Sequence, residues 1–371
     1  MNYAVVVYRI TAKIIPTVKP FFYLLATGNF QVALSTGLCM SNNSSDSPIH
    51  ILITGGAGFI GSNLAEHLVQ SGIRVTVLDN LLTGKIENIS HLMDSELFTF
   101  VEGDIRDFQT CKDAAAGCTH ISHQAALGSV PRSIDDPITS LEINISGTVN
   151  VFRAAVEEGV KRIVFASSSS VYGNDQTLPK TEAKVGEVLS PYAASKRSME
   201  LIQQAFVECY DVEILGFRYF NVFGKRQDPE GPYAAVIPKF IMSLANGETP
   251  FIFGDGEQSR DFTHISNVVS GNAAALMRPS LGKLNGKVIN LAYGGMTTVN
   301  ELFYGIRENV SRQHPDALAI EPSYQAKRLG DILHSHANID MAKSELGFVP
   351  GIAIDEGLQR TVEWYLSQMK D

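Results

Sequence analysis

The chain has 371 residues, with 30 Lys and Arg against 39 Asp and Glu, so its formal net charge is −9. Apolar residues make up 44% of the chain, which excludes wholesale disorder, and the length indicates two lobes or one large α/β unit. An acidic chain without a block of Lys and Arg is a poor candidate for nucleic-acid binding, because phosphates bind clustered cations. Four cysteines without CxxC spacing predict neither a disulfide framework nor a metal site, and we expect a reducing, cytoplasmic setting.

Residues 1–48 differ in composition from the rest of the chain. The first part is rich in apolar side chains and contains Arg9, Lys13 and Lys19 but no acid, and residues 41–48 are a polar linker. The longest apolar stretch, 21–34, is interrupted by polar residues and is shorter than the ~18–20 residues of a spanning helix. We expect this extension to lie outside the fold, with Met40 as a candidate natural start. A peripheral anchor or targeting segment is the alternative, and no firm membrane association is expected.

A glycine-rich turn follows the first β-rich run, residues 49–54, and leads into a helical run that ends near residue 72. Gly55 permits a tight turn, Gly58 lets the backbone approach a pyrophosphate, and Gly61 lets the helix pack closely on the strand. Phe59 and Ile60 would then begin the helix, whose first N–H groups favour an anion. Strand, glycine turn and helix in this order predict a dinucleotide site.

Two acidic residues follow the next two predicted strands, residues 73–78 and 97–103. Asp79 lies 21 residues after Gly58, where a carboxylate accepts hydrogen bonds from the adenosine ribose and repels a 2′-phosphate. This position favours NAD over NADP, although Asp79 as a simple turn residue is the alternative, and Asn80 would lie beside it. Asp104, followed by Ile105, would either accept from the adenine amino group or cap the following helix.

The predicted strand 120–123 leads into Gln124, Ala125 and Ala126. Small residues at a strand end let the backbone pass close to a cofactor. We expect His123 to pack at the strand end and not to act as a base.

A catalytic constellation is predicted from strand 161–166 and helix 191–209. The strand ends in four serines, 167–170, and Tyr192 and Lys196 are four residues apart, so both project from one helix face. A nearby ammonium is expected to lower the Tyr192 pKa from its usual value of about 10. Alone, such a pair is more often a surface pair; behind a dinucleotide turn and a serine-bearing strand end, it favours a catalytic role.

In this order the motifs resemble those of the extended short-chain dehydrogenase/reductase family of nucleotide-sugar-modifying enzymes, from about residue 49 to the C-terminus. The runs 123–140, 218–240 and 254–262 are similar to the bacterial UDP-N-acetylglucosamine 4-epimerases, which supply UDP-GalNAc or its uronic acid for surface polysaccharides. The resemblance implies that NAD is a recycled cofactor. It also implies that Tyr192 takes the proton from the sugar C4 hydroxyl, Ser168 holds the C4 oxygen, and Lys196 polarises Tyr192 and binds the nicotinamide ribose.

Other branches of that family need carboxylates directly after the serine-bearing strand. Dehydratases carry an Asp-Glu pair there and decarboxylases commonly keep a Glu, whereas this chain has Ser169 and Ser170. Without an acid and a base at those positions, elimination chemistry is disfavoured and 4-epimerisation is favoured.

The resemblance further implies a binding site for a UDP-sugar. Asn221 is expected near a UDP phosphate, Val236 and Lys239 over the uracil, Arg260 and Arg328 on the diphosphate, and Asp331 on the uridine ribose. Epimerases restricted to non-acetylated hexoses carry a Tyr four residues after that aspartate, where this chain has Ser335, which leaves room for a 2-acetamido group. Ser129, Ser133, Ser168 and Ser169 are expected near the sugar. Arg132 alternatively meets a C6 carboxylate, so the N-acetylhexosamine and its uronic acid both stay open.

Alternating strands and helices predict a Rossmann-type, doubly wound parallel sheet with a smaller C-terminal α/β substrate lobe. We expect an NAD-binding domain over 49–225 and a nucleotide-sugar lobe mainly over 226–371, interleaved so that about 261–299 return to the first domain. Apolar positions on more than one face of helices 137–158 and 190–210, together with the resemblance, imply a homodimer through a four-helix bundle. These positions include Ile143, Val149, Phe152 and Val156, and burial within the subunit is the alternative.

Two other functions remain open at this point. One is another NAD-dependent nucleotide-sugar oxidoreductase, such as a UDP-glucuronate or UDP-glucose 4-epimerase. The other is a non-catalytic NAD-binding regulator, which the intact set of Ser168, Tyr192 and Lys196 disfavours.

Overall fold

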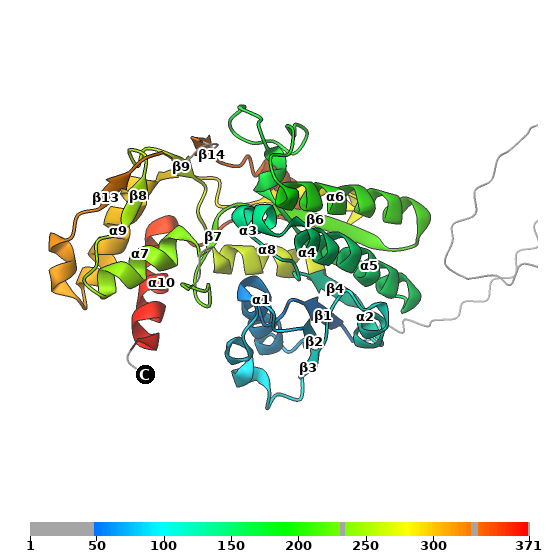
Figure 1. Ribbon diagram of the computed structural model, residues 1–371. Helices are drawn as coiled ribbons and strands as arrows, with labels where there is room; N and C mark the ends of the chain where they lie inside the picture. Colours follow the sequence, from blue (N-terminus) through cyan, green and yellow to red (C-terminus); the bar gives the residue numbers. More distant parts are fainter. Residues whose placement is uncertain (1–47, 231–233, 328–332, 370–371) are drawn as a thin grey trace, which may run out of the picture.

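The computed structural model describes residues 48–230, 234–327 and 333–369 (Figure 1). The expected N-terminal extension, Arg328 and Asp331 lie outside the described residues. Seven parallel strands form one sheet in the order β11-β6-β5-β4-β1-β2-β3. The strands are β1 (His50–Thr54), β2 (Arg74–Asp79), β3 (Phe98–Glu102), β4 (His120–His123), β5 (Arg162–Ser168), β6 (Glu213–Tyr219) and β11 (Val288–Leu291). This is a doubly wound Rossmann-like sheet, so the predicted fold class is confirmed.

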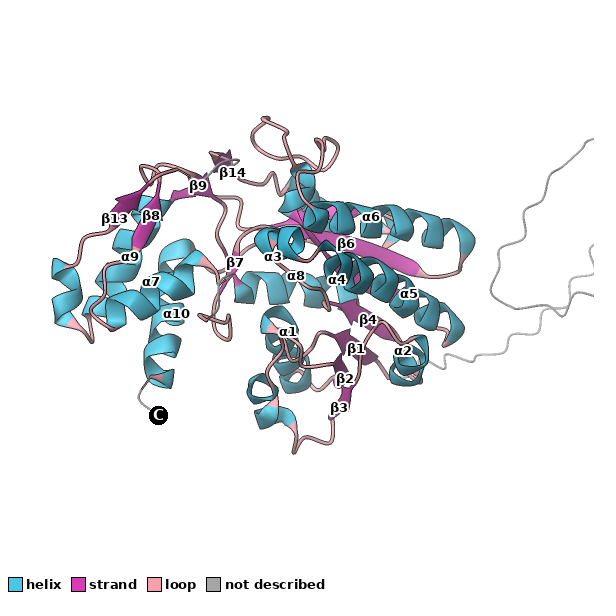
Figure 2. Cartoon of the chain, in the orientation of Figure 1, coloured by secondary structure: helices cyan, strands magenta, loops and turns pink. Residues whose placement is uncertain are grey.

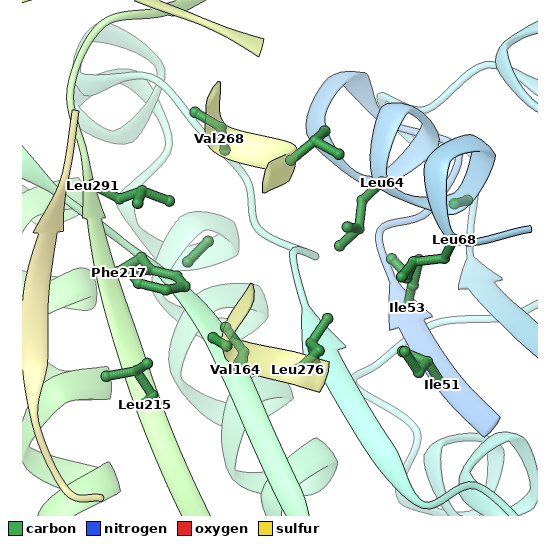
Figure 3. Close-up of a cluster of buried hydrophobic side chains, with 14 of the residues drawn as sticks. Ile51, Ile53, Leu64, Leu68, Val164, Leu215, Phe217, Val268, Leu276 and Leu291 are labelled. Carbon is green, nitrogen blue, oxygen red and sulfur yellow. The ribbon is translucent and has the colours of Figure 1, made fainter. Parts of the chain in front are cut away.

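Helices cover both faces of the sheet, as Figure 2 shows. One face carries α1 (Phe59–Gln70) and α8 (Ile265–Met277), and the other carries α2 (Phe108–Ala115), α5 (Gly147–Glu157) and α6 (Pro191–Cys209). Because both faces are covered, the central strands are buried almost throughout and need no alternation of apolar and polar residues. In the first core, Leu64 of α1 and Val268 of α8 pack over Ile53, Val164 and Phe217 of the sheet (Figure 3).

The strand order reverses between β1 and β4, which lie side by side although two strands separate them in the sequence. Their following loops diverge to opposite faces, and ligands of open α/β sheets bind in the crevice that this opens. The fold therefore places the glycine turn after β1 next to the small residues after β4.

The region predicted as a helix over 137–158 is helical over residues 137–157. In it, α4 (Pro137–Leu141) continues through a π-helical turn over 142–146 into α5, and α3 (Val130–Asp135) lies just upstream. Three of the four apolar positions that suggested a dimer helix are buried within the subunit: Ile143 is 6% exposed, Phe152 0% and Val156 5%. They pack in a second hydrophobic core, between the sheet and α2, α5 and α6. Of the four positions, only Val149, which is 37% exposed, is available for a contact with another subunit.

A second, smaller lobe has a core of its own. It is built from α7 (Val236–Ala245), α9 (Val299–Ser311) and α10 (Ile354–Gln368), with Phe240, Phe303 and Val362 at its centre. Short strands complete it: β8 (Phe251–Phe253) pairs with β13 (Ser323–Gln325), and β9 (Ser259–Arg260) lies between β12 (Thr297–Thr298) and β14 (His334–Ser335). Between the lobes, β7 (Val222–Phe223) pairs with β10 (Thr263–His264). The lobe is formed by two separate segments of the chain, because α8 and β11, which lie between these segments in the sequence, pack with the large sheet. Within the described residues, no helix is long and apolar enough to cross a bilayer.

Candidate active site

A cavity of about 490 Å³ lies at the carboxyl ends of β1, β2, β4 and β5. It brings together residues that are more than 140 positions apart in the chain. All the residues predicted to contact the dinucleotide line it, together with the predicted catalytic residues and three of the predicted substrate residues, one of which, Ser168, is also catalytic. These are Gly55, Gly58, Phe59, Ile60, Gly61, Asp79, Asn80, Asp104, Ile105, Gln124, Ala125, Ala126, Ser168, Ser169, Tyr192, Lys196 and Asn221.

The glycine turn is shaped by close backbone contacts. Gly55 has φ +70°, and a Cβ there would stand 2.6 Å from the Ala125 backbone; a Cβ on Gly61 would stand 2.2 Å from the Gly55 carbonyl oxygen. Gly58 is the N-cap of α1 and has no side chain to satisfy the first N–H groups of the helix. These N–H groups therefore face the cavity, where they fit the pyrophosphate of a dinucleotide.

Asp79 closes the ribose end of the cavity. Its carboxylate accepts hydrogen bonds from the N–H groups of Ala57 and Leu81, each at 2.9 Å. Burial raises the pKa of Asp79 above its ordinary value, although these N–H donors oppose the shift. The carboxylate is thus held at the end of β2 by the glycine turn itself, and its position suits the ribose of NAD.

Asp104 is paired and does not cap a helix. Arg106 donates to it at 2.7 Å and Asn80 at 2.8 Å, and these partners, Arg106 above all, lower the Asp104 pKa to about 2. The N-cap of α2 is instead Asp107, which accepts from the Gln109 N–H. The structure therefore excludes the predicted capping role of Asp104, and its contact with the adenine amino group stays a prediction.

Lys196 and Tyr192 lie on one face of α6, as predicted. The Lys196 ammonium donates to the Ala166 carbonyl at 2.7 Å and lies 5.9 Å from the centre of the Tyr192 ring. Lys196 is only 2% exposed, and burial lowers its pKa to about 7. Burial also raises the Tyr192 pKa, against a smaller opposing effect of the Ser168 hydrogen bond. The net direction of the Tyr192 pKa in the protein alone is therefore upward, because burial of the phenol is the larger effect.

The start of α6 is fixed by serines. Ser190 caps the helix by accepting from the Ala193 N–H at 3.1 Å. The Ser133 hydroxyl accepts from the Tyr192 N–H at 3.0 Å and donates to the Val130 carbonyl at 2.7 Å. Ser133 is fully buried and holds the backbone of Tyr192 from behind, so its contact with a sugar stays a prediction.

A buried ion pair supports the serine-bearing end of β5. Glu200 on α6 accepts from Arg218 through two hydrogen bonds of 2.9 Å, and from the Ser167 hydroxyl at 2.6 Å. Ser167 precedes Ser168, whose oxygen accepts from the Ser170 N–H at 3.1 Å. The neighbouring hydroxyls thus have different tasks: Ser167 bonds into the core, and Ser168 faces the cavity.

His123 is a buried, neutral strand residue. The Thr148 hydroxyl donates to the Asn144 carbonyl at 2.6 Å, so it accepts from His123 Nε2 at 3.0 Å. His123 Nδ1 is then the acceptor for the Thr54 hydroxyl at 2.7 Å. Burial lowers the pKa of His123 to about 3, so it packs at the strand end and does not act as a base.

Four of the residues predicted to bind the sugar nucleotide, Val236, Lys239, Arg260 and Ser335, lie in the second lobe. Arg260 and Ser335 are register partners in the parallel pair of β9 and β14. Arg260 donates to the Leu333 carbonyl at 3.2 Å, and Val236 and Lys239 lie in the first turns of α7. The N-cap of α3 is Ser129, with φ +98°, next to Gly128 on the cavity wall.

Gln227 is among the cavity residues that the sequence analysis did not assign to the site. Gln227 lines the cavity, and its Oε1 atom is buried without a hydrogen-bond partner among the described residues. It lies in the 218–240 run that carries the family resemblance, but only the fold shows that this segment returns to the dinucleotide site.

The chain is similar to several known proteins. Residues 51–292 match the NAD dependent epimerase/dehydratase family. A UDP-glucose 4-epimerase of Mycolicibacterium smegmatis is 37% identical over 85% of this chain and 97% of its own length. A UDP-glucuronate 4-epimerase of Thermodesulfobacterium geofontis is 33% identical over 85% of this chain and 95% of its own. The solved UDP-N-acetylglucosamine 4-epimerase of Methanobrevibacter ruminantium, in complex with UDP-N-acetylmuramic acid, is 38% identical, with a TM-score of 0.80, over 87% of this chain and 99% of that one.

The chain belongs to the NAD-dependent epimerase/dehydratase family. It is an enzyme of the extended short-chain dehydrogenase/reductase type with NAD as its cofactor, and its relatives act on UDP-sugars.

Proposed function

We propose that this enzyme is a UDP-N-acetylhexosamine 4-epimerase, which interconverts UDP-GlcNAc and UDP-GalNAc. One observation carries the reaction type. Among the described residues that line the cavity, the only acids are Asp79 and Asp104, and both are engaged at the adenosine end. Elimination from a sugar needs an acid and a base beside the ring, and Ser169 and Ser170 supply neither.

The residues around the reacting carbon suffice for reversible proton transfer. Tyr192 takes the proton from the C4 hydroxyl, and Ser168 holds the C4 oxygen through its hydroxyl. Lys196, fixed by the Ala166 carbonyl, compensates charge on the phenol and binds the nicotinamide ribose. When bound, NAD supplies a reversible hydride acceptor. The resulting 4-keto sugar turns within the site, and reduction from its other face completes the epimerisation.

The substrate assignment rests on a small residue beside a cation. Ser335 is the strand partner of Arg260, which is proposed to bind the diphosphate. A serine here leaves space beside the sugar where a tyrosine would fill it, so a 2-acetamido group is accepted. The similarity to a solved UDP-N-acetylglucosamine 4-epimerase supports this choice.

A second candidate is 4-epimerisation of the corresponding uronic acids. Arg132 lies in α3, three residues after Ser129 and four after the cavity-wall residue Gly128. A guanidinium there suits a C6 carboxylate. The UDP-glucuronate 4-epimerase among the relatives favours the same possibility.

We further propose that two copies pair through α4, α5 and α6 to bury an apolar surface. Ile138 on α4 is 79% exposed, Leu201 on α6 52% and Val149 on α5 37%. Ile134 on the adjoining α3 is 60% exposed. Apolar side chains grouped on neighbouring helices are typical of a subunit interface.

The deciding experiment is incubation of the purified protein with UDP-GlcNAc, UDP-GalNAc, UDP-Glc and the corresponding uronic acids, followed by separation of the 4-epimers. We expect interconversion of UDP-GlcNAc and UDP-GalNAc without net NADH at 340 nm. Turnover of the uronic acids alone would select the second candidate. No epimer from any substrate would reject both.

A further inference from the structure

A short segment between the lobes crosses onto the first helix of the dinucleotide domain. Residues 224–228, here called the strap, follow β7 and precede α7. The strap begins at Gly224, where φ is +148° and a Cβ would stand 2.4 Å from the Ile265 side chain. Arg226 has φ +69°, a left-handed conformation that costs a non-glycine residue free energy. Such a backbone persists only where its surroundings hold it in place.

Those surroundings are the first turns of α1, the helix whose N-terminus faces the cavity. Glu66 accepts from Lys225 at 2.5 Å and from Arg226 at 3.1 Å. Arg226 also donates to the Ser62 carbonyl at 3.3 Å, and Asn63 donates to the Lys225 carbonyl at 3.1 Å. The side chains of Glu66 and Arg226 are 17% and 11% exposed, so this ion pair is largely shielded from water.

The next residue of the strap points into the dinucleotide cavity. Gln227 donates from Nε2 to the Val222 carbonyl at 3.1 Å, which fixes the orientation of its amide. The Oε1 atom is buried and has no hydrogen-bond partner among the described residues, and Gln227 lines the same cavity as Gly58. The Gln227 backbone carbonyl accepts from the Tyr365 hydroxyl, so the strap is held from the second lobe as well. A buried amide oxygen without a donor is costly unless a ligand supplies one.

We propose that the strap retains NAD: Gln227 Oε1 accepts a hydrogen bond from a hydroxyl group of the bound dinucleotide, and Glu66 is a positioning residue that locks the strap onto α1. The unpaired oxygen is explained because the dinucleotide riboses carry hydroxyl donors and its phosphates carry none. A cofactor that is regenerated in every cycle has no need to leave between cycles. Because the strap lies outside the reacting centre, its contacts slow the release of NAD without changing the reaction itself. The inference rests on the family cofactor and not on the identity of the sugar.

The test measures NAD release, with no sugar substrate present. The purified full chain is loaded with radiolabelled NAD⁺, chased with excess unlabelled NAD⁺, and the retained label is followed by filtration. We expect Glu66→Gln and Gln227→Leu each to speed release about five-fold, the effect of losing one partly shielded ion pair or one neutral hydrogen bond. Because Glu66 acts by positioning Gln227, the double variant should release NAD little faster than Gln227→Leu alone.

The matched control is Glu356→Gln on α10, which breaks an exposed ion pair with Arg360 of similar length and should leave release unchanged. Thermal unfolding followed by circular dichroism checks that each variant is folded. Wild-type release rates in either Glu66→Gln or Gln227→Leu would overturn the proposal, and so would effects that multiply fully in the double variant.

Discussion

The Lys196 ammonium and the Tyr192 ring lie 5.9 Å apart on one face of α6, with the ammonium bound to the Ala166 carbonyl. Both side chains are desolvated, so burial favours the neutral form of each: it raises the Tyr192 pKa and lowers the Lys196 pKa to about 7. A charge placed in the cavity by a bound cofactor would shift both equilibria. Proton transfer by Tyr192 is therefore expected to depend on the loaded cofactor site.

Removal of the Tyr192 hydroxyl tests its role directly. Tyr192→Phe should lower kcat about 10²- to 10⁴-fold, the range expected for loss of a general acid–base group. NAD binding should persist, because the glycine turn and Asp79 are untouched. The measurements are epimer formation under saturating UDP-sugar and NAD retention of the same preparation. Activity within a factor of a few of the wild type would assign the proton to another group.

Ser335 is the position at which sugar choice can be changed. Ser335→Tyr should selectively lose the N-acetylated substrates, because the larger side chain takes the space of the 2-acetamido group. The check is kcat/KM for UDP-GlcNAc and for UDP-Glc on the same preparation, with Ser335→Ala as the control that keeps the space open. Equal loss on all sugars would count against the assignment.

The buried pair of Glu200 and Arg218 is expected to affect both stability and catalysis. Glu200→Gln leaves the 3% exposed Arg218 without its carboxylate, which should lower the free energy of unfolding by about 3–5 kcal/mol. It also replaces one carboxylate oxygen beside Ser167 and Arg218 by an NH2 group, so the end of β5 shifts and kcat falls. Urea unfolding and epimer formation report the two effects. Glu157→Gln, which breaks ion pairs on the surface of α5, should change neither by much.

Acid should destabilise the fold through its buried histidines. The folded-state pKa of His123 is lowered to about 3, and those of His120 and His264 to about 4, mainly by burial. Because the unfolded chain takes up these protons below pH ~6.5, stability is complete above that pH and is lost as the pH falls toward 4. For His123→Asn we expect a lower free energy of unfolding at pH 7 but a shallower decline between pH 6.5 and 4.5. The measurement is urea unfolding at several pH values. An unchanged dependence of the free energy of unfolding on pH in His123→Asn would contradict the argument.

The proposed subunit contact can be disrupted by one charge. Ile138 is 79% exposed on α4, so Ile138→Glu costs little in the monomer but places a charge in the proposed interface. Sedimentation velocity should show a dimer for the wild type and a monomer for the variant. Leu82→Glu, also at an exposed position but away from these helices, is the control. A wild-type monomer at micromolar concentration would reject the proposed contact.

Much of the fold could be predicted because local patterns agree with the tertiary structure. The run 49–54, the glycines after it and the helix that follows form β1, the turn and α1 within two or three residues of the predicted bounds. The segment 137–158 was predicted as a helix and is helical over 137–157, but a π-helical turn over 142–146 shifts the register of its side chains. The apolar residues found there face two environments, and periodicity alone does not separate them.

The candidate site divides in the same way. Tyr192 and Lys196 are four residues apart on one helix, so their common face follows from helix geometry. The tasks of Ser133 and Gln227 depend on segments 59 residues or more away in the chain, and no local pattern reports such contacts. The pKa of Tyr192 likewise depends on how deeply the fold buries it, which residue spacing does not show.

The return of α8 and β11 to the sheet has a consequence for how the molecule is assembled. The chain enters the second lobe, comes back to complete the first, and leaves again, so neither lobe is a continuous piece of sequence. A fragment ending at residue 225 would lack the edge strand β11 and the helix that covers Ile53 and Val164. We therefore expect the two lobes to fold as one cooperative unit and to unfold in a single transition. The sugar-nucleotide end thereby shares the stability of the dinucleotide end.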